Sequence, residues 1–133
     1  MSTRTVTKEL YMNYLKKAEE CFSAMNDEFA KGNYNSCVIA AIHCAISSAD
    51  ALTVFFKGVR HSGERHEDVI RLILSLELDK SELNRNIMHL SNLLSIKNKA
   101  EYEEKLTTQN GAFSALTNAE RFFKWVKGIM KRG

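Results

Sequence analysis

The sequence predicts an all-α protein, and three observations support this fold class. The 133 residues include no proline, the residue that ends helices and marks turns. No segment rich in Val, Ile or Thr alternates with the period of two that is typical of strands, so we expect no strand. Apolar residues instead recur every three or four positions. We therefore expect a five-helix antiparallel up-and-down bundle that forms one domain over residues 1–133.

The first two expected helices are the longest. The first runs from about Thr5 to Lys31 and ends at Gly32; the second runs from about Asn35 to Lys57 and ends at Gly58. The second helix is apolar nearly all round, and such a helix is buried on all faces. We expect it to be the central helix or half of a dimer seam. The first helix carries one apolar stripe, formed by Leu10, Tyr11, Tyr14, Leu15, Ala18, Phe22, Met25 and Phe29.

A loop and three further helices complete the expected bundle. Asp79 and Glu82 have the spacing of a capping box, which predicts the start of the fourth helix. A polar stretch breaks the apolar pattern before the fifth helix. The expected bounds are Val59 to Ser62 for the loop, Gly63 to Leu78 for helix three, Asp79 to about Tyr102 for helix four, Thr107 to Gly111 for the polar stretch, and Ala112 to Met130 for helix five.

Charge and cysteine content set limits on function. The net charge of +3 is too mild to indicate nucleic-acid binding by itself. The three cysteines are odd in number, lie in apolar helical stretches and form no CxxC pair. They favour buried free thiols in a reducing, cytoplasmic setting, with no metal and no cofactor. The most apolar stretch, Cys37 to Phe56, contains a histidine and an aspartate, so we interpret it as a core helix and expect no association with a membrane.

That stretch contains the first candidate site. His43 and Asp50 lie seven positions apart, so both should be on the same face of the second helix. They are candidates for an active-site or ligand-binding pair. We favour a structural interpretation, in which they form a polar network that includes Ser47, because a buried carboxylate needs hydrogen-bond donors.

The second candidate site is the charged loop from Arg60 to His66. Two histidines and two arginines near a helix start can bind a phosphate. Arg60 and His66 also suit metal-independent RNA cleavage, in which histidine moves the proton and arginine stabilises the phosphorane. We favour a solvated loop instead. A zinc site built from His61, His66 and a cysteine matches no standard framework.

Three segments carry a resemblance to a known family. The segment from Ala40 to Leu52 is similar to the second helix of HEPN-domain proteins. The segment Lys97-Asn98-Lys99-Ala100-Glu101-Tyr102 resembles the HEPN signature, and Ala119 to Val126 resembles a HEPN last helix. The resemblance covers nearly the whole chain and implies a HEPN-like bundle.

The resemblance also implies a function class. Many HEPN domains are metal-independent endoribonucleases of toxin–antitoxin and related systems, and they commonly dimerise around paired motifs. Their motif has an arginine, often an asparagine next to it, and a histidine four to six residues later. Lys97, Asn98 and Tyr102 occupy the matching positions. Lysine lacks the planar fork of arginine, and tyrosine, with a pKa of about 10, is a poor proton carrier at neutral pH. We therefore expect no catalytic residue here.

These observations predict a non-catalytic binding or accessory module. Its cleft would use Lys97, Asn98 and Tyr102 for a nucleotide, a nucleic acid or a protein, and the resemblance implies a homodimer and a nucleotidyltransferase-type partner. Arg60, His66, His43 and Asp50 are secondary candidates. Two alternatives stay open: a HEPN-type endoribonuclease using Arg60 and His66 or an unorthodox lysine–tyrosine site, and a purely structural oligomerisation domain.

Overall fold

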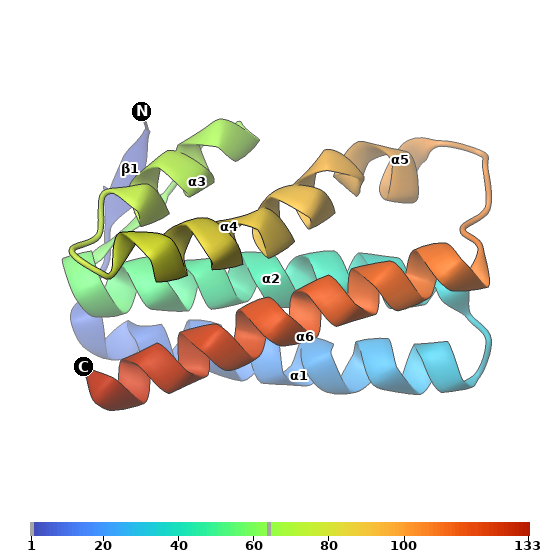
Figure 1. Ribbon diagram of the computed structural model, residues 1–133, viewed down its shortest axis with the longest axis horizontal. Coiled ribbons are helices and arrows are strands. Elements are labelled where there is room, and N and C mark those ends of the chain that lie inside the picture. The colour runs from blue at the N-terminus through green and yellow to red at the C-terminus, as the bar shows by residue number, and fades with distance from the viewer. Residues whose placement is uncertain (1, 64) are drawn as a thin grey trace.

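Four long helices that run alternately in opposite directions form the body of the protein (Figure 1). They are α1 (Tyr11–Ala30), α2 (Tyr34–Lys57), α4 (Lys80–Ser95) and α6 (Gln109–Arg132). The computed structural model describes residues 2–63 and 65–133. Glu64, in the charged loop from Arg60 to His66, lies outside these residues, as does the side chain of His66. The all-α prediction is confirmed.

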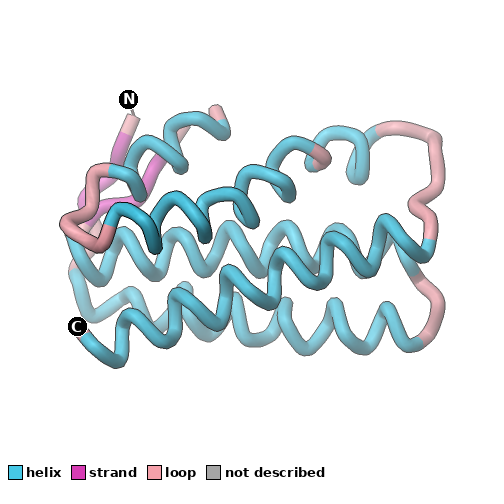
Figure 2. The backbone as a smooth tube through the Cα atoms, viewed as in Figure 1, coloured by secondary structure: helices cyan, strands magenta, loops and turns pink. Residues whose placement is uncertain are grey.

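The shorter elements are a two-stranded sheet and three short helices. The sheet lies at the end of the bundle that holds both termini (Figures 1 and 2). Its strands are antiparallel, with Thr3 opposite His61 and Thr5 opposite Val59. The elements are β1 (Thr3–Thr5), the 3₁₀ helix η1 (Lys8–Leu10), β2 (Val59–His61), α3 (His66–Leu74) and α5 (Lys97–Tyr102).

The expectations of no strand and of a first helix starting at Thr5 were therefore wrong. Both strands have three residues, which is too short for an alternating pattern to be visible. Their pairing joins segments more than fifty positions apart, so local sequence does not indicate it. Thr5 belongs to β1, and the α-helical segment begins at Tyr11.

Helix α2 is the central helix, as the first of the two alternatives predicted. It contacts α1, α6, α4, α5 and α3. Ile42 and Leu52 are fully buried in a core that also includes Met25 of α1 and Phe122 of α6. By length and composition α2 could cross a membrane, but 67% of its most apolar stretch is buried inside the protein. This burial is what we expect of a core helix.

Helix ends follow the predicted signals at several positions. Gly32 and Gly58 adopt φ of +79° and +67°, which glycine accommodates without steric cost, and they follow α1 and α2. The Asp79 carboxylate accepts the Glu82 backbone N–H at 2.9 Å, so the cap of α4 is confirmed. The Glu82 side chain, however, extends to α6 rather than back to the cap, and accepts hydrogen bonds from Trp125 and Arg132.

Several predicted helix bounds differ from the structure. Helix α3 runs from His66 to Leu74 rather than from Gly63 to Leu78. The fourth predicted helix is divided at Ile96 into α4 and α5, although no glycine or proline marks the break. Helix α6 begins within the stretch expected to be a break, because the Thr108 hydroxyl accepts the Gly111 N–H at 3.0 Å. The polar residues there form a helix cap, and do not interrupt the helix.

Candidate functional site

An open groove of about 620 Å³ lies where β2 and the start of α3 face the junction of α4 and α5. Apolar side chains from three helices contribute Ile46, Val69 and Leu94 to its lining. The rest of the lining is mostly polar and basic, and consists of His61, Gly63, Arg65, Glu67, Lys97, Asn98 and Tyr102. The groove therefore brings the predicted cleft residues of α5 next to the charged segment after β2.

Glu101 organises the α5 side of the groove. Its carboxylate contacts Lys97 Nζ at 3.3 Å through one oxygen and His43 Nε2 at 3.4 Å through the other. The Glu101 side chain is only 12% exposed, so both contacts are partly shielded from water. Tyr102 is 77% exposed at the end of α5. This side of the groove thus combines a held cation, the Asn98 amide and an exposed aromatic ring.

Asp50 organises the β2 side. Its carboxylate is buried and contacts Arg60 Nη2 at 3.3 Å and His61 Nδ1 at 3.4 Å. The Arg60 guanidinium also lies 5.7 Å from the centre of the Tyr14 ring, in a cation–π arrangement. Asp50 therefore fixes β2 to the central helix, and with it the position of His61 at the groove.

The comparison with known families bears directly on this arrangement. Residues 11–129 match the HEPN domain family, which is related in general to nucleotides and RNA. This chain is a HEPN domain. No curated protein matches its sequence. The HEPN resemblance of the signature segment placed Lys97, Asn98 and Tyr102 at one site, and these three residues line the groove on α5.

His43 and Asp50 do not form the single polar network that was predicted for this HEPN domain. Both residues lie on the face of α2 that includes Ile46, as their spacing predicts. His43 contacts Glu101 of α5, however, whereas Asp50 contacts β2. Ser47 makes no hydrogen bond that joins them within the described part of the chain. The expectation of a single network was wrong because seven helical positions separate the two side chains by about 10 Å.

The charged loop also differs from its prediction. Arg60 does not line the groove, because Asp50 and Tyr14 hold its guanidinium. His66 begins α3, and its side chain lies outside the described residues. His61 and Arg65 line the groove instead, although the sequence offered nothing to rank them above their neighbours. His61 is positioned by its contact with the carboxylate of Asp50, which is eleven residues away in the sequence, and no local sequence pattern indicates such a contact.

The cysteines and potential metal ligands give no further site of this kind. Burial raises the pKa of Cys44 to about 12 and that of Cys37 to about 11, so both thiols are protonated at neutral pH. Burial also raises the pKa of Cys21. Apart from the side chain of His66, residues 2–63 and 65–133 contain no group of three His, Cys, Asp or Glu side chains arranged to hold a metal ion.

Proposed function

We propose that this HEPN domain is a non-catalytic module that binds nucleotide units, as a free nucleotide or within single-stranded RNA. The observation that carries the proposal is the convergence of two walls on one groove. His61 and Arg65 approach from the β2–α3 side, and Lys97, Asn98 and Tyr102 approach from α5. Family membership supports the same class of ligand.

The side chains in the groove suit both parts of a nucleotide. Arg65 and Lys97 are cations that can contact phosphate oxygens. Tyr102 offers an exposed ring on which an unpaired base can stack, and the Asn98 amide can donate to and accept from a base edge. Stacking requires a base outside a duplex, which favours single strands over double-stranded RNA.

Two ion pairs reduce the positive charge of the groove. Lys97 is paired with Glu101 at 3.3 Å, and Arg65 lies 3.7 Å from Glu67. A phosphate would share these cations with the carboxylates, so each cation attracts a phosphate less strongly than an unpaired cation would. We expect moderate affinity that falls as salt is added.

An endoribonuclease is the second candidate, and one observation favours it. His61 lines the same groove and contacts the buried carboxylate of Asp50, an arrangement that can orient an imidazole for proton transfer. The α5 positions that match the family motif still carry Lys97 and Tyr102, which is why we propose binding without cleavage. A nucleotidyltransferase-type partner, a cytoplasmic location and a toxin–antitoxin setting are further proposals, supported by family membership and sequence composition.

The test is fluorescence anisotropy with a labelled ten-nucleotide single-stranded RNA, with ATP and GTP as competitors. We expect Lys97→Gln and Tyr102→Ala each to weaken RNA binding roughly five- to tenfold, and Tyr102→Phe to retain it because the ring can still stack. If ATP or GTP displaces the labelled RNA more readily than unlabelled RNA does, the groove prefers free nucleotides to RNA.

Lys124→Gln is the matched control, since Lys124 pairs with Glu120 four positions away, as Lys97 pairs with Glu101. It lies on α6, outside the groove. This variant should bind RNA like the parent. Failure of the parent to bind either RNA or nucleotides, or equal losses in Lys97→Gln and Lys124→Gln, would overturn the proposal.

A further inference from the structure

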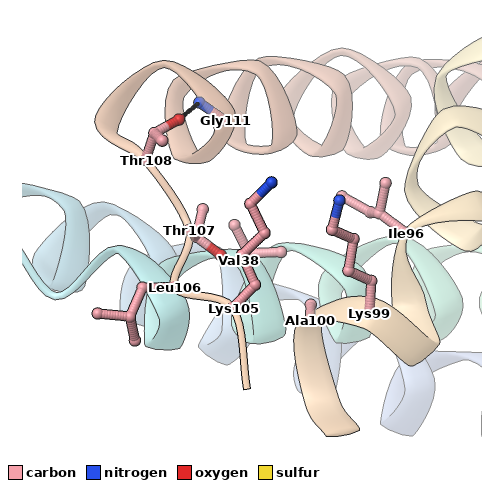
Figure 3. A pocket seen from close by; sticks show the side chains of 9 residues that line it. All are labelled: Val38, Ile96, Lys99, Ala100, Lys105, Leu106, Thr107, Thr108 and Gly111. Carbon is pink, nitrogen blue, oxygen red and sulfur yellow. Dashed lines mark hydrogen bonds between the residues drawn. The ribbon is translucent and has the colours of Figure 1, made fainter. Parts of the chain in front are cut away.

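A second cavity, of about 260 Å³, lies between α5, the loop that follows it and the first turn of α6 (Figure 3). Val38 of α2, which is 2% exposed, contributes to its lining, together with Ile96 and Ala100. Leu106, 75% exposed, adds apolar surface that is open to water. A cavity of about 150 Å³ can hold benzene, so this one has room for a short apolar group.

Two lysines lie over this apolar space. Lys99 comes from α5 and Lys105 from the following loop, and both side chains extend toward α6 (Figure 3). Neither ammonium group has a carboxylate or hydrogen-bond partner within the described residues, unlike the neighbouring Lys97. Two cations without a counter-charge therefore line one apolar cavity, and a bound anion would be attracted to both.

The start of α6 adds to the same electrostatic preference. Thr108 and Gly111 line the cavity, and α6 is 24 residues long, so the positive end of its dipole lies there. The Thr108 hydroxyl already accepts the Gly111 N–H. The start of α6 is therefore capped, and Lys99 and Lys105 are the groups that can contact an anionic ligand directly.

We propose that this cavity binds a small amphipathic anion of the class of medium-chain carboxylates. The apolar tail would lie against Val38, Ile96 and Ala100, and the carboxylate would contact Lys99 and Lys105. Inorganic phosphate has no tail for the apolar walls, and a neutral alcohol leaves the two ammonium groups without a counter-charge. This site is separate from the groove and does not depend on the function proposed for it.

The test is a titration of the ¹⁵N-labelled protein with octanoate, followed by NMR, beside octanol and inorganic phosphate. We expect octanoate to shift the backbone amides of Ala100 and Gly111, octanol to bind roughly tenfold more weakly, and phosphate to cause no saturable shift there. Lys99→Gln and Lys105→Gln should each weaken octanoate binding several-fold.

Two further variants complete the test. Lys131→Gln, at the opposite end of α6, should bind octanoate like the parent. Ala100→Leu should fill the cavity and abolish binding; should it fail to fold, the lysine variants still decide. Octanol binding as tightly as octanoate, equal losses in Lys131→Gln and Lys99→Gln, or no saturable octanoate shift in the parent would overturn the proposal.

Discussion

At the scale of single residues, Asp50 is the charged residue with the smallest exposed fraction in the described part of the chain. Its carboxylate is buried on the central helix, where an unpaired charge would be costly. Arg60 approaches it from β2 and supplies the compensating positive charge at 3.3 Å, and the His61 imidazole lies 3.4 Å away. Among the described residues, the Arg60 Nε atom finds no hydrogen-bond partner although it is buried, so this side chain depends on its contacts with Asp50 and Tyr14.

Asp50→Ala should lower the free energy of unfolding by about 1–3 kcal/mol, because it leaves the mostly buried Arg60 and His61 side chains of β2 without the carboxylate that they contact. Urea denaturation followed by circular dichroism measures this loss. Asp50→Asn keeps one acceptor oxygen and should lose less. A variant that unfolds like the parent but no longer binds RNA would show instead that Asp50 has a functional role.

Lys97 and Tyr102 lead to a prediction about chemistry. The purified protein should not cleave RNA, because cleavage needs a proton carrier of near-neutral pKa and a fixed cation at the phosphate. Incubation of structured and single-stranded RNAs with the protein in the presence of a metal chelator measures whether cleavage occurs. Replacing both residues to give Lys97→Arg, Tyr102→His should restore partial cleavage if the groove keeps the family geometry.

Cleavage by the parent that disappears in Lys97→Ala, Tyr102→Ala would contradict the prediction and establish a lysine–tyrosine site. Cleavage that survives in that double variant but vanishes in His61→Ala would assign proton transfer to the histidine held by Asp50. Arg60→Ala and His66→Ala test the remaining residues of the charged segment in the same assay.

At the scale of elements, the helices were predictable because their signals are local. Gly32 and Gly58 marked two helix ends, and Asp79 marked a start. The β1–β2 pairing was not predictable, since it joins Thr3 to His61 across the whole of α1 and α2. The break at Ile96 also escaped, because the apolar period continues through it.

The groove was predictable on one side only. Family resemblance indicated Lys97, Asn98 and Tyr102 because they fall in one short segment. Arg65 and His61 reach the groove because β2 turns the chain back over α2 and the first turn of α3 follows. That arrangement depends on tertiary contacts such as those of Asp50 with β2, and no motif in the sequence encodes it.

Glu82 connects α4 to α6 and gives a prediction about pH. Hydrogen bonds from Arg132 and then Trp125 lower the pKa of the Glu82 carboxyl below its usual range. A lowered folded-state pKa contributes stability above the unfolded-state pKa of about 4.3, and this contribution is lost as the pH falls through the folded-state value. Glu82→Gln should therefore lower the free energy of unfolding at pH 7 and have a much smaller effect in strong acid.

Thermal unfolding of parent and variant between pH 7 and pH 3 measures this difference. Glu103→Gln is the control, because Glu103 is exposed and has no ion pair or hydrogen bond from its side chain within the described residues. A difference between parent and Glu82→Gln that stays constant across the pH range would contradict the proposed role of the Glu82 charge.

At the scale of the whole molecule, the structure changes the argument for a dimer. The sequence suggested that α2 has more apolar faces than one bundle can cover. Helices of the same chain cover it, however, so α2 does not require a partner. Large apolar side chains are exposed elsewhere, and the described residues include Leu10, Met12, Met88, Tyr102, Leu106 and Phe113. Family membership and these side chains now support the proposal of a homodimer.

Light scattering coupled to size exclusion should give a mass about twice the 15.1 kDa of one chain at micromolar concentration. Met88, 63% exposed on α4, and Phe113, 58% exposed on α6, are the large apolar residues whose substitution tests the interface. Burying such side chains at a homodimer interface removes apolar surface from water, whereas a charge at the same position would have to lose its hydration. We therefore expect Met88→Glu or Phe113→Glu to shift the protein toward the monomer. Ser23→Glu, at an exposed position on α1, controls for the single added negative charge, and a parent mass of about 15 kDa would refute the dimer.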